Sequence, residues 1–323
     1  MRRRKIQTPM LMVLLLAVLA VFGVAACGGD DDDSASSGDQ KSSSSSDQPG
    51  KGKPAVKLGT KDFTEEFVLG QLYAQALKAK GYNVDLKSNI GPTEITDKAL
   101  TSGKIDAYPE YSGESTATVF GIDKIYDSPE ATVADAKKHY EERGQVVSNP
   151  TPFEDVDAIA ATKEFAQKNG LASMEDLKKL KPSFTLGARP EFKSRQQGLK
   201  GMEDVYGIHN AKFKQLALGL QYKALDKGDV DTANIFSTDA QLASGKYTVL
   251  KDPKGVFGHQ NVLFVINKPK YDALGGTQFM DVINSVNKLL TAEAMRSMNS
   301  AVDIDKKDPA EVAKAFLDAN KLT

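Results

Sequence analysis

Two tyrosines stand close together in the stretch IDAYPEYSGE, at the end of a predicted strand. They are Tyr108 and Tyr111, in a chain with no tryptophan and only 7% aromatic residues. Ring faces at the carboxyl end of a strand can form the wall of a ligand pocket. An ordinary surface turn is the alternative interpretation of the same residues.

Two basic residues also follow predicted strands. Lys61 comes after the first strand in GTKDFTEE, and Arg195 lies in the polar loop ARPEFKSRQQG after the strand FTLGA. In open parallel sheets, ligands sit beyond the carboxyl ends of the strands. Lys61, with the amides after Gly59, could therefore face an anion, and Arg195 could clamp a carboxylate through two parallel hydrogen bonds. Exposed surface side chains are the alternative for both residues.

Catalytic motifs are missing from the sequence. It contains no GxSxG, Walker A, HExxH or GxGxxG pattern. His139, His209 and His259 lie far apart, and Cys27 is the only cysteine, so a zinc site is not expected. Of the three histidines, only His259, just before a strand in VFGHQN, is placed to reach a cleft. We therefore expect a binding protein without metal or cofactor rather than an enzyme.

Strands and helices alternate along the chain from residue 55 onward. AVKLGT and YNVDLKS are typical of strands, and the segment between them has apolar residues at the three-to-four spacing of a helix. Thr64 is the predicted N-cap of this helix and Gly81 its C-terminal stop. A strand–helix–strand unit of this length implies a parallel sheet. The continued alternation predicts an α/β protein of two lobes, which a length of 323 residues allows.

The N-terminus has the form of a secretory signal over residues 1–26, with a basic start followed by an apolar run. Its ending, VAAC, resembles the lipobox of bacterial lipoproteins, which implies that Cys27 is acylated. An uncleaved membrane anchor is the alternative. Residues 27–54 are almost entirely polar or small and predict a disordered tether. We expect a lipid-anchored protein on the outer face of the cytoplasmic membrane, periplasmic or cell-surface.

The charge of the chain gives no support for nucleic-acid binding. The formal net charge is −1, and the only charges before Cys27 are those of Arg2, Arg3, Arg4 and Lys5. The remainder of the chain is therefore mildly acidic, whereas nucleic-acid-binding proteins carry a basic surface.

Five segments resemble the osmoprotectant-binding proteins of ABC importers, of the glycine betaine/choline/carnitine type. They are GTKDFTEEFVLGQLYAQALKAKGYNV, GPTEITDKALTSGKIDAYPEYSG, FTLGARPEFKSRQQGLKGMEDVYG, LALGLQYKALDKGDVDTANIFSTDAQL and DPAEVAKAFL. The resemblance implies a type II periplasmic-binding-protein fold, in which two α/β lobes enclose a ligand cleft. Lobe one would comprise residues 55–158 with 261–323, and lobe two residues 159–260. We expect a monomer that passes its ligand to an ABC permease.

The family's ligand is a quaternary ammonium, often with a carboxylate. Ring faces hold such a cation, and basic side chains or amides hold the carboxylate. By resemblance, Lys61 matches the family's carboxylate-contacting lysine, and Arg195 matches its arginine after the dipeptide EF. Tyr111 matches the tyrosine of the family's PEYTGT, and Phe236 stands where the family often has tyrosine.

Several positions depart from the family pattern. Ile159 replaces an aromatic residue, Gln260 and Asn261 replace two tyrosines, and Glu114 replaces a threonine. Asp157 completes the set of candidate ligand-binding residues. These departures leave an alternative open, in which the receptor binds a more polar metabolite.

Only a few other residues could supply the missing rings. Phe257, His259 and Tyr108 are the candidates, although Tyr108 lies an odd number of residues from Tyr111 and is better explained as a core residue.

We expect the lobes to close around the ligand. An extracellular sensor that takes no part in transport is a further alternative.

Overall fold

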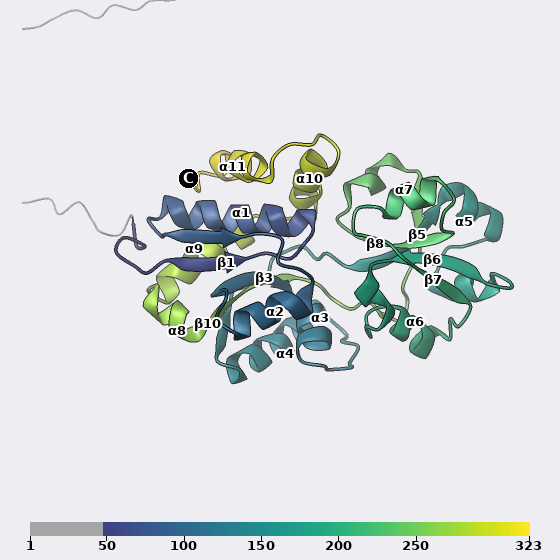
Figure 1. The fold of residues 1–323 in the computed structure, drawn as a ribbon, viewed down its shortest axis with the longest axis horizontal. Helices are drawn as coiled ribbons and strands as arrows, with labels where there is room; N and C mark the ends of the chain where they lie inside the picture. The colour runs from purple at the N-terminus through teal and green to yellow at the C-terminus, as the bar shows by residue number, and fades with distance from the viewer. Residues whose placement is uncertain (1–47) are drawn as a thin grey trace, which may run out of the picture. The chain divides into compact units, whose positions relative to one another are not determined.

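The computed structural model describes residues 48–323 of the chain (Figure 1). The predicted signal segment, Cys27 and the tether up to residue 47 lie outside the described residues. Over residues 48–323, no helix combines the length and the apolar character that crossing a membrane requires.

The first sheet has five strands in the spatial order β2-β1-β3-β10-β4. Its strands are β1 (Val56–Gly59), β2 (Val84–Lys87), β3 (Ala107–Tyr111), β4 (Gln145–Val147) and β10 (Val262–Asn267). The helices of this lobe are α1 (Thr64–Ala79), α2 (Thr93–Thr101), α3 (Ser112–Glu114), η1 (Ser115–Val119), α4 (Pro129–Glu142), α8 (Lys268–Ala273), α9 (Thr277–Asn287), α10 (Ala292–Asp303) and α11 (Pro309–Ala319). β1 is parallel to β2 and β3, whereas β10 is antiparallel to β3 and β4.

β10 joins two hydrophobic layers of this lobe. Val262, Phe264 and Ile266 belong to the layer that contains α1, α9, α10 and α11. Leu263 and Val265 belong to the layer that contains α2 and α4. Figure 1 shows α1 and α11 on one side of the sheet and α2 and α4 on the other. Successive residues of a strand face opposite ways, so an apolar run through β10 fills both layers.

The two tyrosines of β3 face opposite layers, as their odd spacing predicts. Tyr108 is fully buried in the layer with α2 and α4, and its hydroxyl donates to Glu110 Oε2 at 3.2 Å. Tyr111 belongs to the layer with α1. The interpretation of Tyr108 as a core residue is confirmed.

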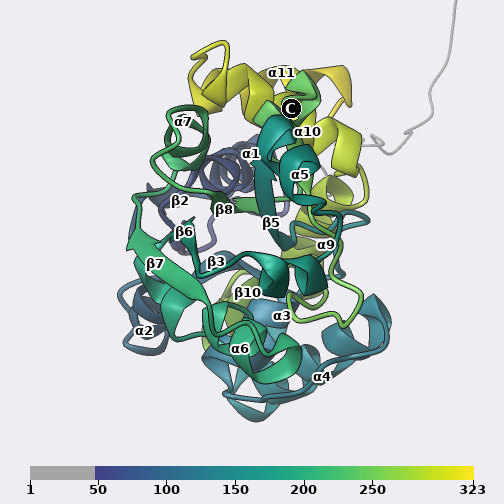
Figure 2. The same cartoon turned by 90° about the vertical axis from the view of Figure 1, so that its right-hand side faces the viewer.

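The second sheet also has five strands, in the order β7-β6-β8-β5-β9. Its strands are β5 (Asp157–Thr162), β6 (Phe184–Ala188), β7 (Ala211–Gln215), β8 (Thr232–Phe236) and β9 (Tyr247–Val249). Its helices are α5 (Lys163–Asn169), η2 (Met174–Lys179), η3 (Pro190–Lys193), α6 (Leu199–Tyr206), α7 (Gln221–Asp226) and η4 (Ala240–Ser244). Figure 2 shows α6 and α7 on opposite sides of this sheet, and each belongs to a separate hydrophobic cluster. The two predicted α/β lobes are confirmed.

Two segments, residues 148–156 and 250–261, connect the sheets. They run antiparallel, because the N–H of Asp155 donates to Gln260 O and that of Thr151 to Val262 O, both at 3.1 Å. Paired connections of this kind can act as a hinge between lobes.

β5 starts earlier than the predicted lobe boundary. Asp157 and Ala158, placed in lobe one from the sequence, pair with Phe236 and Ile235 of β8 in the second sheet. Backbone pairing with β8 therefore brings both residues into lobe two.

Helix α1 begins differently from the prediction. Phe63 occupies the N-cap position and no side chain caps the helix, so the predicted N-cap role of Thr64 is wrong. The Thr64 hydroxyl donates instead to Asp303 Oδ1 of α10 at 2.6 Å. Glu66 turns back toward the helix start, where its Oε2 accepts the N–H of Lys61 at 3.0 Å.

Residues 48–54, expected to be the end of the tether, form turns against lobe one. The N–H of Gly50 donates to Lys80 O at 2.9 Å, and Gly50 is buried. A Cβ at this position would lie 2.3 Å from the backbone nitrogen of Tyr82, so only glycine fits.

Gly81 has φ +82° just after α1, and the prediction that it ends this helix is confirmed.

Two strands, β7 and β9, carry no clear sequence signal. β7 is an edge strand whose Lys212 and Lys214 are exposed, and β9 is an edge strand of three residues. Edge strands commonly carry charged side chains, which weakens the hydrophobic pattern from which strands are predicted.

We predict that Phe264→Ala lowers the free energy of unfolding by about 3–5 kcal/mol, because it opens a cavity in the core. Phe264 is fully buried and packs edge-on against Tyr73 at 5.2 Å between ring centroids. Urea denaturation measures the change. The control Val249→Ala, at an exposed position of β9, should shift stability by less than about 0.5 kcal/mol. Equal effects of the two substitutions would contradict the assignment of β10 to the core.

We predict that stability falls as the pH rises toward 8, because burial raises the pKa of Glu66 to about 8 against the opposing attraction of Lys61. The unfolded chain releases this proton above roughly pH 4.3. Between these values folding takes up a proton, so the free energy of unfolding decreases with increasing pH. Thermal melts at pH 5.5 and 8 measure the decrease. Glu66→Gln should reduce it, and an identical decrease in the variant would exclude Glu66 as its source.

Candidate functional site

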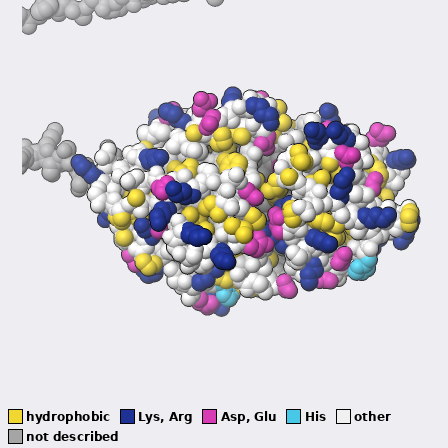
Figure 3. Space-filling view, in the orientation of Figure 1, with side chains coloured by type: hydrophobic (Ala, Val, Ile, Leu, Met, Phe, Trp, Pro, Cys, Tyr) yellow, Lys and Arg dark blue, Asp and Glu magenta, His cyan; other side chains and the backbone are white. Residues whose placement is uncertain are grey.

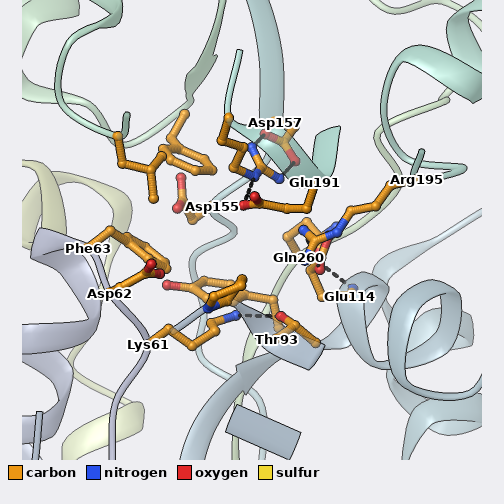
Figure 4. Close-up of a pocket in the computed structure, with 15 residues that line it drawn as sticks. Lys61, Asp62, Phe63, Thr93, Glu114, Asp155, Asp157, Glu191, Arg195 and Gln260 are labelled. Atoms are coloured by element: carbon orange, nitrogen blue, oxygen red, sulfur yellow. Dashed lines mark hydrogen bonds and ion pairs between the residues drawn. The ribbon is translucent and has the colours of Figure 1, made fainter. Parts of the chain in front are cut away.

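A cavity lies where the carboxyl ends of β1, β3, β6 and β8 approach one another. Acidic side chains gather where the two lobes meet on the face seen in Figure 3, and Figure 4 shows the residues inside. The free volume of the cavity is about 40 Å³, below the usual range for small-molecule sites. Its lining residues are Lys61, Asp62, Phe63, Pro92, Thr93, Tyr111, Glu114, Asp155, Asp157, Arg189, Glu191, Arg195, Leu218, Phe236 and Gln260.

Most of the residues selected from the sequence meet in this cavity. Those that line it are Lys61, Tyr111, Glu114, Asp157, Arg195, Phe236 and Gln260. Asn261 does not line it. Among residues 48–323, no group of His, Cys, Asp or Glu side chains is arranged to hold a metal ion.

Three aromatic rings form one wall of the cavity. Phe63 is stacked on Tyr111, with ring centroids 6.1 Å apart, and on Phe236, with centroids 5.5 Å apart. Phe63 precedes α1, Tyr111 ends β3 and Phe236 ends β8, so both lobes contribute rings. Ring faces of this kind attract cations.

Lys61 is buried beneath these rings. Its Nζ forms an ion pair with Glu110, contacts Thr93 Oγ1 at 3.3 Å and lies 4.3 Å from the centroid of Tyr111. Burial alone would lower the pKa of Lys61, but the neighbouring carboxylates, Glu110 first, raise it above its ordinary value. Lys61 is therefore a cation whose charge the protein itself compensates.

Arg195 extends from lobe two to two carboxylates of lobe one. Its Nε and Nη2 donate to Glu94 at 3.2 and 2.9 Å, and its Nη1 lies 2.9 Å from Glu114 Oε2. The guanidinium is buried. Arg195 therefore binds carboxylates, as predicted, but these carboxylates belong to side chains of the protein itself.

Arg189, which follows β6, was not singled out from the sequence. Its guanidinium holds Asp157 through Nη1 and Nη2 at 2.6 and 2.8 Å and donates to Asn234 Oδ1 at 2.6 Å. It also contacts Glu191 at 3.2 Å and lies 5.2 Å from the ring centroid of Phe236. Asp157, a predicted site residue, therefore orients Arg189 at the cavity wall.

Two carboxyl groups share one hydroxyl across the lobe interface. Thr238 Oγ1 lies 2.7 Å from Glu65 Oε2 and 2.7 Å from Asp155 Oδ1. A hydroxyl has one hydrogen to donate, so the second contact requires a proton on a carboxyl oxygen. Burial raises the pKa of Asp155 well above its ordinary value, with a further rise from Glu65, and burial also raises the pKa of Glu65. The two acids therefore hold a proton between them.

The amides of Gln260 and Asn261 are used within the protein. Gln260 Oε1 accepts the N–H of Glu114 at 3.0 Å, and its Nε2 donates to Gln197 Oε1 at 2.8 Å. Asn261 Nδ2 donates to the carbonyl of Thr151 at 3.0 Å. Gln260 thus lines the cavity with its amide already bonded, and Asn261 fastens the two connecting segments to each other.

None of the substitutes considered for the missing rings reaches the cavity. Tyr108 and Phe257 are core residues, and His259 Nδ1 lies 3.2 Å from Glu154 Oε1 outside the lining set. Ile159 is buried in the core of lobe two. The third ring comes from Phe63 instead.

Sequence reasoning missed Phe63, Arg189 and Asp155. Phe63 had a signal, because it lies two residues after Lys61 and ahead of the helix start. Arg189 also had one, since it directly follows β6 as Lys61 follows β1. Asp155 had none, because its position depends on the pairing of the connecting segments.

Comparison with known proteins identifies the family. The family model OpuAC, described as the substrate binding domain of the ABC-type glycine betaine transport system, matches residues 54–319. A glycine-betaine-binding protein of Pseudomonas aeruginosa is 31% identical over 273 residues, which cover 81% of this chain and 86% of that protein. The carnitine transport binding protein OpuCC of Listeria monocytogenes is 27% identical over 284 residues, covering 84% of this chain and 88% of that protein.

A solved structure confirms the predicted fold. The crystal structure of a glycine betaine/carnitine/choline ABC transporter has a TM-score of 0.67 at 23% identity, covering 83% of this chain and 99% of that chain. The family consists of binding proteins and not of enzymes. The chain belongs to the OpuAC family and is the extracytoplasmic substrate-binding component of an ABC importer.

Proposed function

We propose that the cavity between the lobes binds a quaternary amine of the glycine betaine, carnitine or choline type. The observation that carries this proposal is the wall formed by Phe63, Tyr111 and Phe236 in a cavity rich in carboxylates. A methylated ammonium has no N–H to donate, so ring faces and negative charge are the groups that can hold it. The named ligands of the Pseudomonas and Listeria relatives support the same chemistry.

Contacts inside the protein illustrate how this wall receives cations. Lys61 Nζ lies 4.3 Å from the centroid of Tyr111 and 5.8 Å from that of Phe63, and the Arg189 guanidinium lies 5.2 Å from that of Phe236. Each ring therefore already attracts a positive group of the protein. A ligand cation in the cavity would meet the same rings in a partly desolvated setting, where this attraction is strongest.

The alternative of a more polar ligand loses part of its support. It was based on Gln260, Asn261 and Glu114, whose polar groups could bind hydroxyls or amines. The amide oxygen and nitrogen of Gln260 are bonded to Glu114 and Gln197, and Asn261 lies outside the cavity lining. Of these three residues, only Glu114 still has a polar side chain that lines the cavity and accepts no hydrogen bond.

Ligand binding would be coupled to closure of the lobes. Lobe one supplies Lys61, Phe63 and Tyr111, and lobe two supplies Arg195 and Phe236. A ligand that touches rings of both lobes stabilises the state in which the lobes meet, and so shifts the equilibrium toward it. The closed protein would then present its ligand to the permease.

The protein would be held at the membrane by a lipid on Cys27. This residue and the tether up to residue 47 lie outside the described structure, so the proposal rests on the sequence VAAC and the signal-like segment before it. A single acyl chain binds membranes weakly, so stable anchoring takes a second lipid chain, as a lipoprotein anchor provides.

We predict that Phe236→Ala weakens binding of a quaternary amine by about 2- to 30-fold, the effect of losing 0.5–2 kcal/mol of cation–π attraction. Isothermal calorimetry with glycine betaine, carnitine and choline measures it. Phe213→Ala, which removes a ring of the same lobe outside the cavity, is the control and should keep the wild-type affinity. Equal losses in the two variants would count against the aromatic wall.

We predict that Cys27→Ala abolishes incorporation of labelled fatty acid into the protein, because the acceptor sulfur is removed. Labelling of cells with a fatty acid, followed by mass analysis of the purified protein, measures the modification. Ala26→Gly keeps a small residue before the cysteine and should remain labelled. A wild-type protein without label would exclude the lipid anchor and leave an uncleaved or fully removed signal segment as the alternatives.

A further inference from the structure

Arg195 is the residue best placed to bind a ligand carboxylate, yet its hydrogen-bonding edge is occupied. Glu94 accepts hydrogen bonds from Nε and Nη2 of Arg195, and Oε2 of Glu114 lies 2.9 Å from Nη1. An arginine binds a carboxylate strongly through two parallel N–H groups. With Glu94 on one edge and Glu114 on the other, a ligand carboxylate would have to displace a carboxylate of the protein.

The other two cations of the cavity are occupied in the same way. Lys61 is paired with Glu110, and Arg189 is paired with Asp157 and Glu191. The lining contains these three cations but five acids: Asp62, Glu114, Asp155, Asp157 and Glu191. Every basic group along the lining therefore has a carboxylate partner, and negative charge is in excess even with the proton that Asp155 shares with Glu65.

Glu114 is a buried carboxylate of the cavity lining that accepts no hydrogen bond. Its side chain is 9% exposed, and neither of its oxygens accepts a hydrogen bond. The approach of Arg195 Nη1 to Oε2 is an ion pair without hydrogen-bond alignment, and Oε1 has no donor. A buried carboxylate compensated by a single ion pair is stabilised further when another positive charge comes close to it. In Figure 4 Glu114 lies with Arg195 at one end of the cavity.

We propose that Glu114 takes the place of a ligand carboxylate, so that the cavity prefers quaternary amines that are net cations over zwitterions that carry a carboxylate. This inference rests on the proposed function, binding of a quaternary amine at this cavity. Choline-type ligands add one positive charge to an acidic cavity. Glycine betaine brings a carboxylate that meets Glu114 and finds Arg195 already bound.

Choline and glycine betaine provide a matched pair of probes, because both carry a trimethylammonium and differ in a hydroxymethyl group against a carboxylate. Calorimetry on the wild-type protein should give at least about tenfold tighter binding of choline. Equal or tighter binding of glycine betaine would overturn the inference and leave the proposed function standing. Failure of choline, glycine betaine and carnitine all to bind would overturn the proposed function and this inference with it, whereas binding of carnitine alone would overturn only the inference.

Glu114→Gln tests the residue itself. The amide keeps the size of the side chain, removes its charge and frees Nη1 of Arg195, so the preference for choline over glycine betaine should shrink by about tenfold. Glu191→Gln is the charge-matched control, since Arg189 keeps its double contact with Asp157. It should change their ratio much less than Glu114→Gln does. The same change of ratio in both variants, or an unchanged ratio in Glu114→Gln, would overturn the role of Glu114. Thermal melts of each variant report folding separately.

Discussion

The contact of Arg195 with Glu94 and Glu114 joins the two lobes at the cavity, and much of the site depends on it. A buried guanidinium must be compensated, and here the compensation comes from the opposite lobe. The same contact closes one end of the cavity, decides which charges remain available inside it and links the position of lobe two to that of lobe one. The arrangement of the lobes and the charge of the binding surface are therefore set by one group of side chains.

A second link between the lobes works through neutral and acidic groups. Thr238 of lobe two lies between Glu65 of α1 and Asp155 of the connecting segment, and Asn299 of α10 donates to Glu65 at 3.0 Å. Because the shared hydroxyl requires a carboxyl proton, this contact forms only with a proton in place. The closed arrangement thus combines an ion pair at one end of the cavity with a proton-dependent contact at the other.

The sequence predicted the fold better than it predicted the ion pairs and hydrogen bonds of the cavity residues. Hydrophobic alternation in β1 and the apolar run of β10 revealed two interior strands, whereas the edge strands β7, which carries exposed lysines, and β9, which has three residues, lack such a pattern. Lys61, Arg195 and Tyr111 were found because they follow or end a predicted strand, whereas Phe236, Gln260 and Glu114 were found through the family resemblance. Their partners were not foreseeable: Arg189 meets Asp157, and Arg195 meets Glu94, only through the folding of segments about 30 and 100 residues apart. Phe63 was within reach, since it adjoins Lys61 at the entry to α1.

The position of β10 has a consequence for the order in which the protein can form. Residues 262–267 lie between β3 and β4, so these two strands of the first sheet stay unconnected until nearly the whole polypeptide is available. The second sheet is built from one uninterrupted stretch, β5 to β9. A chain that emerges from the membrane N-terminus first would therefore assemble its second lobe as a unit, while the first lobe waits for β10.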